Sequence, residues 1–235
     1  SRAVNRLHYQ ERGGLVFIEG EPGMGKTTLA SLGLEQARKL GMETAIGVAN
    51  SVEEATPYLV WKKILWQLWA GGSTVRSEVR KRLIQFVGKN EEHVNFISVL
   101  NDVLALELPE TDSTKGLSGK TRGEHLHNLM AFLFQKLTQR QPLVLLIDDI
   151  QWLDTASKDL ISSISARVEK VLFILTSRPG GHGAGIAFEA GGRKAPQLSL
   201  KPMSLGETRA LVRQCLNVEN VPDTLVEIIQ QRGGG

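Results

Sequence analysis

The stretch Gly20-Glu21-Pro22-Gly23-Met24-Gly25-Lys26-Thr27 decides the fold of this chain. It follows an apolar run, residues 15–18, and matches the pattern G-x-x-x-x-G-K-[ST], which forms a phosphate-binding loop between a strand and a helix. Its glycines let the backbone approach a ligand closely, and the following helix presents its first amide groups to an anion. A glycine-rich turn that matches by chance is the alternative. Because the whole pattern is in register between an apolar strand and a helix, the stretch predicts that the chain binds a nucleoside triphosphate.

Each polar group of this loop has an expected partner on the nucleotide. The backbone amides of the loop and of the first helical turn are expected to form an anion cradle. The Lys26 ammonium is expected to reach the β- and γ-phosphates, and the Thr27 hydroxyl to take one position around Mg²⁺. Thr28 adds a hydroxyl near the α-phosphate. The predicted nucleotide-binding residues are Gly20, Glu21, Pro22, Gly23, Met24, Gly25, Lys26, Thr27 and Thr28.

A second run, residues 143–149, reads as a buried strand that ends in two carboxylates. The carboxyl ends of central parallel strands are where open α/β sheets bind ligands. Asp148 is therefore expected to hold Mg²⁺, directly or through water, and Asp149 to polarise the attacking water. The alternative is that both are acidic residues preceding the next helix, although Asp154 or Thr155 could equally cap that helix. The upstream phosphate-binding loop favours the metal role.

Residues 171–176 are predicted to form the fourth strand, which ends at Ser177-Arg178-Pro179. A cation and hydroxyl groups at this strand tip would lie beside the phosphate site, where Arg178 could sense the γ-phosphate. A solvated loop arginine is the alternative. The candidate catalytic residues are therefore Lys26, Asp149 and Arg178.

The rest of the chain predicts an alternation of strands and helices. Residues 1–12 are typical of a short amphipathic helix, and residues 26–40 of the helix after the loop. A second strand is predicted at residues 44–49, which completes a right-handed βαβ unit. A short fifth strand follows at residues 197–200, after a glycine-rich segment, residues 179–193, that is expected to be mobile.

A long helical insertion, about residues 57–120, is predicted between the second and third strands, with helices at 57–69, 75–87 and 94–106. Three of the four tryptophans, Trp61, Trp66 and Trp69, lie on its first helix. Such a stripe could stack on bases or bind a partner, but at helical spacing it more often belongs to the core. The polar residues 108–119 are expected to form a flexible loop.

Histidine and cysteine residues predict no further site. His125 and His127, on a helix predicted at residues 122–139, lie two positions apart and therefore face different sides. They are a poor metal pair, and a solvated role is predicted for both. Cys215 is the only cysteine, which excludes an intramolecular disulfide and a cysteine-built zinc site. Its apolar helical position predicts a small buried side chain.

The composition is that of an ordinary globular chain. Its 235 residues are 41% hydrophobic and 23% charged, which is enough for a full α/β core. The net charge of +3 is spread without a run of lysine or arginine, and this argues against binding of nucleic acid. No apolar run approaches a membrane span and no signal pattern opens the sequence, so the cytoplasm is the expected compartment.

Three motifs together resemble the STAND branch of AAA-related P-loop ATPases, which are signal-transduction ATPases with numerous domains. They are residues 20–28, residues 148–154 (Asp-Asp-Ile-Gln-Trp-Leu-Asp) and residues 175–178 (Leu-Thr-Ser-Arg). The second motif is much more specific than a generic strand end with two acids. The chain is most similar to the Orc1-like AAA ATPase module that occurs beside class III (soluble-type) adenylyl cyclase domains, signalling kinases and LuxR- or MalT-like regulators.

This resemblance implies a fold and a domain organisation. The expected fold is a doubly wound α/β P-loop domain with strand order 5-1-4-3-2. Residues 1–202 would form the ATPase domain, and residues 203–235, with helices predicted at 205–216 and 222–231, would form the start of a truncated helical lid. Output and sensor domains are expected elsewhere in a longer chain, and nucleotide-dependent oligomerisation is compatible with the family.

The resemblance also implies a role for each site residue. Lys26 would bind the β- and γ-phosphates, and Thr27 and Asp148 would bind Mg²⁺. Asp149 would occupy the water-activating position and Arg178 the sensor position. Many relatives in the wider AAA class have a glutamate where Asp149 stands, so the shorter arm predicts slow hydrolysis.

Three functions remain open at this point. The leading one is a switch driven by ATP and Mg²⁺ that hydrolyses ATP and relays lid movement to an output domain. The second is a regulatory or scaffold module that holds ADP or ATP with negligible turnover. The third is a DNA-dependent ATPase, against which the absence of a winged-helix or basic recognition segment argues.

Overall fold

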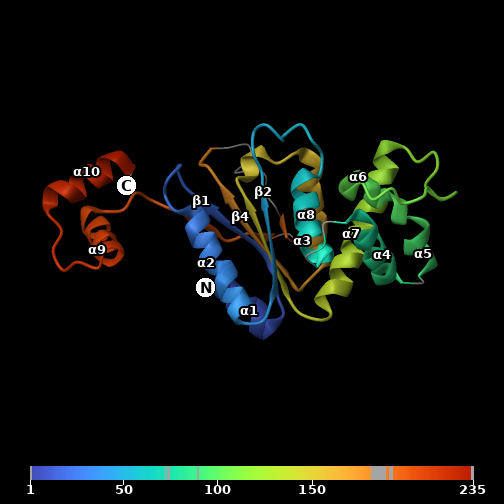
Figure 1. The fold of residues 1–235 in the computed structure, drawn as a ribbon, viewed down its shortest axis with the longest axis horizontal. Coiled ribbons are helices and arrows are strands. Elements are labelled where there is room, and N and C mark those ends of the chain that lie inside the picture. The colour runs from blue at the N-terminus through green and yellow to red at the C-terminus, as the bar shows by residue number, and fades with distance from the viewer. Residues whose placement is uncertain are drawn as a thin grey trace.

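A five-stranded parallel sheet forms the centre of the protein, for which we use a computed structural model (Figure 1). The structure describes residues 2–71, 73, 75–88, 90–180, 189–190 and 193–233. The strands are β1 (Gly14–Glu19), β2 (Glu43–Val48), β3 (Leu143–Asp148), β4 (Val171–Ser177) and β7 (Gln197–Ser199). Neighbouring strands are parallel and lie in the order β2-β3-β4-β1-β7. Read from the β7 edge, this confirms the predicted strand order 5-1-4-3-2.

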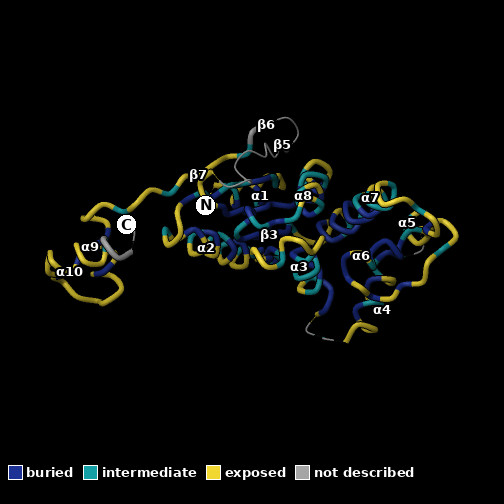
Figure 2. Tube along the Cα trace, turned by 90° about the horizontal axis from the view of Figure 1, so that it is seen from above, coloured by how far each residue is buried: buried dark blue, intermediate teal, exposed yellow. Residues whose placement is uncertain are grey.

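The two central strands are buried along their whole length. Every residue of β3 and of β4 is inaccessible or nearly so, and Figure 2 shows β3 in dark blue. Continuous apolar runs are what such strands need, because helices cover both faces of a parallel sheet. These runs position the carboxyl ends of both strands, where the polar residues begin, at one edge of the sheet.

Two helices cover one face of the sheet. They are α1 (Arg2–Gln10), which buries Val4 and Leu7 as the amphipathic pattern predicts, and α2 (Lys26–Lys39). Both belong to one hydrophobic cluster with side chains of β1, β3 and β4. Gly33 of α2 lets the helix lie close to β4, since a Cβ at this position would lie 3.1 Å from Ile174 Cδ1.

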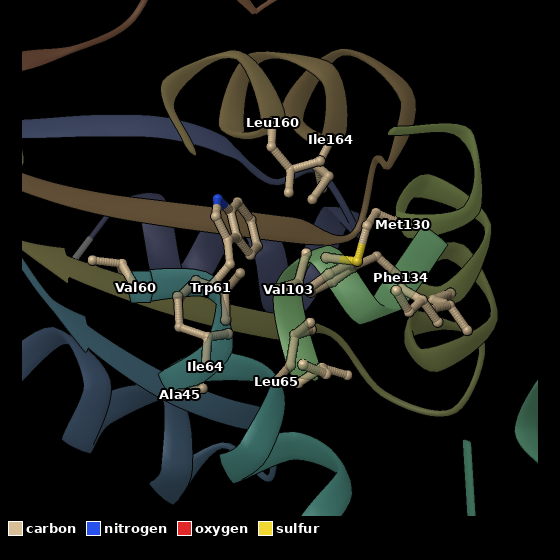
Figure 3. Close-up of a cluster of buried hydrophobic side chains, with 14 of the residues drawn as sticks. Ala45, Val60, Trp61, Ile64, Leu65, Val103, Met130, Phe134, Leu160 and Ile164 are labelled. Carbon is tan, nitrogen blue, oxygen red and sulfur yellow. The ribbon is translucent and has the colours of Figure 1, made fainter. Parts of the chain in front are cut away.

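Three helices pack on the opposite face: α3 (Leu59–Ala70), α7 (Gly119–Thr138) and α8 (Thr155–Arg167). Trp61 is fully buried at their centre (Figure 3). Its ring makes edge-on contacts with Phe134 and Phe173 at centroid distances of 5.8 and 6.2 Å, and its Nε1 donates to the Ser157 carbonyl at 3.2 Å. The predicted core role of the tryptophan stripe is confirmed for Trp61 and for Trp69, which is also buried.

The helical insertion is divided into more and shorter helices than the sequence predicts. It continues with α4 (Arg76–Val87), α5 (Glu91–Asn95), η1 (Ile97–Leu100) and α6 (Asn101–Leu104). The single helix predicted at residues 94–106 is therefore wrong. The Asn101 amide exchanges two hydrogen bonds with the Leu108 backbone, and Ala105 adopts a left-handed conformation (φ 48°), so the chain turns back instead of continuing as a helix.

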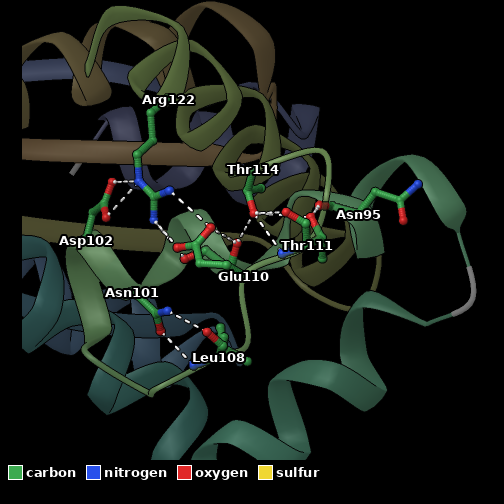
Figure 4. Close-up of polar contacts among 9 residues, drawn as sticks. Asn95, Asn101, Asp102, Leu108, Glu110, Thr111, Thr114 and Arg122 are labelled. Carbon is green, nitrogen blue, oxygen red and sulfur yellow. Dashed lines mark hydrogen bonds and ion pairs between the residues drawn. The ribbon is translucent and has the colours of Figure 1, made fainter. Parts of the chain in front are cut away.

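The loop predicted at residues 108–119 is held by hydrogen bonds (Figure 4). Arg122 contacts Asp102 at 2.8 Å and Glu110 at 3.1 Å, and the Thr114 hydroxyl accepts a hydrogen bond from Ser98 at 2.8 Å. Hydrogen bonds from Thr114, then from Arg122, hold the pKa of Glu110 below its ordinary value. The expectation of a flexible loop overlooked these partners, which lie on neighbouring helices.

The last two helices lie apart from the sheet, at the left of Figure 1. They are α9 (Leu205–Leu216) and α10 (Asp223–Gly233), and they share a small core of Val212, Val221 and Val226. Cys215 is exposed, so its predicted burial is wrong. Within the described chain α9 packs on α10, and most of its surface, including Cys215, stays accessible.

A short two-stranded sheet, β5 (Glu189–Ala190) with β6 (Arg193–Lys194), precedes β7. The expectation of mobility for residues 179–193 falls mainly outside the described residues. Among the helices that are described, none has both the length and the apolar character needed to cross a lipid bilayer.

Candidate functional site

The glycine-rich loop joins the carboxyl end of β1 to the start of α2. Gly23 (φ 86°) and Gly25 (φ 77°) adopt the left-handed conformation that favours glycine, and Gly25 is the N-cap of α2. Gly20 lies close to Leu200. A Cβ at Gly20 would lie 3.1 Å from the Leu200 Cβ. The loop is therefore built as the sequence predicts, with an exposed tip and a helix N-terminus behind it.

The first turn of α2 carries the lysine and the two threonines of the motif. Lys26 is only 8% exposed, and its ammonium donates to the Glu21 carbonyl at 2.9 Å. Within the described chain this is the one acceptor found for a group with three donor hydrogens. Thr27 and Thr28 are exposed at the same turn. The loop thus offers a cation and the Thr28 hydroxyl to an anion.

Asp148, the last residue of β3, connects the loop to the second motif. Its Oδ2 accepts a hydrogen bond from the Thr27 hydroxyl at 2.8 Å, and its Oδ1 accepts one from the Thr176 hydroxyl on β4. Asp148 is 8% exposed and Thr176 is fully buried. The parallel pairing of β3 with β4 brings these two side chains together.

Asp149 begins the turn η2 (Ile150–Trp152) in a left-handed conformation with φ 58° and ψ 49°. Its backbone amide donates to the Thr176 hydroxyl at 2.9 Å, and its Oδ1 accepts from the Gln151 side-chain amide at 2.9 Å. Asp154, not Asp149, caps α8 by accepting from the Ser157 amide at 2.8 Å. The cap of α8 is therefore Asp154, one of the two residues that the sequence offered for this role.

Arg178 follows β4 directly and lies beside the start of the loop. The Gly20 amide donates to the Ser177 carbonyl at 3.3 Å, and the Arg178 amide donates to the Gln151 side-chain oxygen at 3.3 Å. The Arg178 side chain is exposed. No ion pair to it is found among the residues that the structure describes.

The structure thus brings all predicted site residues to one edge of the sheet. The sequence reasoning missed two members of the network, Thr176 and Gln151. Thr176 had a signal, because hydroxyl residues at this strand tip were expected near the phosphate, but its bond to Asp148 was not foreseen. Gln151 served only as a mark of the family resemblance.

The two histidines lie outside this network and are not simply solvated, as was predicted. The His125 ring stacks on Phe96 at a centroid distance of 3.8 Å and an interplanar angle of 8°. His127 is half-buried, and burial lowers its pKa. Among the described residues, no group of three or more histidine, cysteine, aspartate or glutamate side chains is placed to hold a metal ion.

An apolar groove of about 610 Å³ lies between α1, α2 and the β7 edge. None of the candidate site residues lines it. The candidate site residues therefore lie at the carboxyl ends of β1, β3 and β4, and not in this groove.

The arrangement suits the binding of a charged oxygen-rich ligand with a hard cation. Thr27 and Asp148 present adjacent oxygen atoms, which are the ligands that Mg²⁺ prefers. A cation that is held by so few protein ligands completes its coordination with water or with phosphate oxygens. A carboxylate at Asp149 and a guanidinium at Arg178 flank the same strand ends.

Comparison with known families gives a match over most of the chain. The family model described as the AAA ATPase domain matches residues 2–175. The search of curated proteins gives no significant match.

Several solved structures have a similar arrangement at low sequence identity. A Signal Transduction ATPase with Numerous Domains (STAND) protein from Pyrococcus horikoshii is 16% identical, with a TM-score of 0.45, and the match covers 97% of this chain and 27% of that one. The Orc1 protein of Aeropyrum pernix, solved in complex with DNA, is 17% identical, with a TM-score of 0.49 and coverage of 91% and 46%. Cdc6p from Pyrobaculum aerophilum is 11% identical, with a TM-score of 0.50 and coverage of 97% and 51%. At these identities the similarity concerns the fold, and the chain spans about half or less of each of these proteins.

Proposed function

Because this chain belongs to the AAA ATPase domain family, we propose that it is an ATP-binding switch module that hydrolyses ATP with Mg²⁺. The observation that carries the proposal is the contact of 2.8 Å between the Thr27 hydroxyl and the Asp148 carboxylate. It joins the phosphate-binding loop to the acidic strand end across 121 positions of sequence. A hydroxyl on the loop and a carboxylate at the end of β3 form the expected oxygen set for a nucleotide-bound Mg²⁺.

The loop, residues 20–28, would bind the phosphates. Its amides and the N-terminus of α2 supply partial positive charge, and the Lys26 ammonium supplies a full charge. In this structure the ammonium is bonded to the Glu21 carbonyl, an acceptor that phosphate oxygens would replace. Burial of most of the lysine side chain keeps that charge at the loop.

Mg²⁺ would be held by Thr27 and Asp148, and when bound it neutralises charge on the phosphates. The Thr176 hydroxyl keeps one Asp148 oxygen occupied, which directs the other toward Thr27. Asp149 would orient the attacking water, and Arg178 would stabilise charge that develops on the transferred phosphoryl group. Hydrolysis of this kind depends on positioning and charge more than on covalent chemistry.

Residues 1–202 would act as the ATPase domain and residues 203–235 as the first part of a lid. The exposed apolar side chains of α9 and α10 support this division, because these helices have only a small core of their own. The nucleotide state would be relayed through the lid to output and sensor domains of a longer signalling protein, such as an adenylyl cyclase, a kinase or a transcription regulator. Nucleotide-dependent oligomerisation fits the same role.

A second candidate function is a switch that binds nucleotide with negligible turnover. The observation that favours it is the hydrogen bond between Gln151 and Asp149, which occupies one oxygen of a carboxylate on a short side chain. Steady-state release of phosphate separates the two candidates. Turnover that collapses in Asp149→Asn while ATP still binds supports the enzyme, and tight binding without turnover supports the silent switch.

Nucleotide binding itself is tested with Lys26→Ala. We expect ATP with Mg²⁺ to raise the melting temperature of the wild-type chain and to leave that of the variant unchanged, because the loop loses its only full positive charge. Lys81→Ala, at an exposed position of α4, is the matched control and should respond to ATP like the wild type. A wild-type shift in Lys26→Ala contradicts the proposed site.

A further inference from the structure

Gln151 is a buried polar residue that contacts two of the three candidate catalytic residues, the Asp149 carboxylate and the Arg178 backbone. Its side chain is 8% exposed and makes two hydrogen bonds. Nε2 donates to Asp149 Oδ1 at 2.9 Å, and Oε1 accepts from the Arg178 backbone amide at 3.3 Å. One planar amide therefore connects the end of β3 with the end of β4.

The backbone around Gln151 is fixed by its own turn. The Trp152 amide donates to the Asp149 carbonyl at 3.0 Å, and the Leu153 amide donates to the Ile150 carbonyl at 3.1 Å. The left-handed conformation of Asp149 is thus followed by a closed turn that directs the Gln151 side chain back toward it. The bridge does not depend on a mobile loop.

The chemistry of both contacts requires a side-chain amide of this length. The carboxylate of Asp149 needs a donor, and the Arg178 amide needs an acceptor. A glutamate would offer the acceptor but no donor, and a methionine of similar length would offer neither hydrogen bond. An asparagine offers both a donor and an acceptor, but its side chain is shorter than that of glutamine by one methylene group.

We propose that Gln151 is a positioning residue that sets the direction of the Asp149 carboxylate and couples it to the segment that carries Arg178. This inference rests on the proposed function. It adds the residue that holds the Asp149 carboxylate and the Arg178 segment in one arrangement. A shift of the backbone at Arg178 moves the Gln151 side-chain amide, which in turn orients the Asp149 carboxylate. The Arg178 segment and the Asp149 carboxylate therefore change position together.

Turnover measurements on the full chain test the positioning role. Gln151→Met should lower kcat for phosphate release roughly 10- to 100-fold, because misplacement of a catalytic group by about 1 Å has effects of this size. The dissociation constant for ATP should stay close to the wild-type value, since no loop residue is changed. The melting temperature should fall, because the substitution removes two hydrogen bonds of a buried amide. Gln139→Met, at the exposed C-cap position of α7, is the matched control and should leave kcat unchanged.

A double-mutant cycle with Asp149→Asn shows whether Gln151 acts through Asp149. In the Asp149→Asn background, Gln151→Met should cause little further loss of turnover, because the group that it positions is already impaired. Additive losses, or a loss of ATP affinity as large as the loss of kcat, overturn the positioning role.

Amide hydrogen exchange tests the bridge independently of turnover. The Arg178 amide should exchange faster in Gln151→Met, which removes its acceptor, and at nearly the wild-type rate in the control Gln139→Met. Unchanged exchange in Gln151→Met refutes the bridge even when the chain hydrolyses ATP. A wild-type chain that neither binds nor hydrolyses ATP refutes the proposed function, whereas the exchange experiment still decides whether Gln151 holds Arg178.

Discussion

Replacing Thr176 with valine removes one buried hydroxyl that serves two residues of the acidic strand end. The hydroxyl donates to Asp148 Oδ1 and accepts from the Asp149 amide at 2.9 Å. Valine has nearly the same shape, so the packing of this fully buried position changes little. The substitution therefore isolates the two hydrogen bonds.

The expected loss of stability follows from the type of each bond. A hydrogen bond to a charged group contributes about 1.5 to 3 kcal/mol and a neutral one about 0.5 to 1.5 kcal/mol. Together they predict a loss of about 2 to 4.5 kcal/mol, because the Asp149 amide and one Asp148 oxygen are left without a partner. In a chain of this size a loss of 3 kcal/mol lowers Tm by roughly 6 to 12 °C.

Urea unfolding measures this loss directly. Thr176→Val should lower the midpoint with an unchanged m-value, and Thr176→Ser, which keeps the hydroxyl, should recover most of the stability. Thr138→Val is the matched control, because Thr138 is also buried but donates to helix carbonyls, Phe134 and Gln135, that lie in the same helix. We expect the control to lose less than about 1 kcal/mol.

Two outcomes would refute the reasoning about Thr176. One is a loss below about 0.5 kcal/mol in Thr176→Val, which would mean that the two partners find other hydrogen bonds. The other is a loss in Thr176→Ser equal to that in Thr176→Val, which would assign the effect to packing and not to the hydroxyl.

Two further predictions concern the face of the sheet that α3, α7 and α8 cover. Trp61→Ala should destabilise the chain by about 3 to 5 kcal/mol in urea unfolding, because it empties a fully buried position and removes the indole hydrogen bond to the Ser157 carbonyl. Half-buried Trp66→Ala should lose clearly less, and equal losses would contradict the central position of Trp61. Burial lowers the pKa of His127 in the folded chain, so the unfolded chain binds the proton more readily and stability should fall as the pH drops below the ordinary histidine value of 6.5. His127→Gln should make the stability less dependent on pH in that range, and an unchanged pH dependence in the variant would show that other groups cause it.

The placement of the site residues could be predicted because each motif is local. The loop at residues 20–27 and the acidic end of β3 both follow apolar runs, and a parallel sheet brings the carboxyl ends of its strands to one edge. The order of the strands came from the family resemblance, and the structure confirms it. Helix and strand bounds near these motifs agree with the sequence pattern to within a few residues.

The errors occurred where the outcome depends on residues outside the stretch whose pattern was used for the prediction. Residues 94–106 have helical periodicity, but the Asn101 amide finds the Leu108 backbone and the helix ends. Cys215 has an apolar neighbourhood in sequence, yet its helix has only one packed side in the described chain. His125 finds Phe96, which belongs to another element.

The sequence by itself determined that phosphate-binding and acidic motifs share one α/β sheet, because apolar periodicity and glycine placement act over short stretches of chain. Only the tertiary structure decided how the polar groups pair. The Thr27–Asp148 bond joins positions 121 apart, and the bond between Gln151 and Arg178 joins positions 27 apart. Hydrogen bonds require atoms within about 3 Å, and a linear pattern does not define such distances between separate strands.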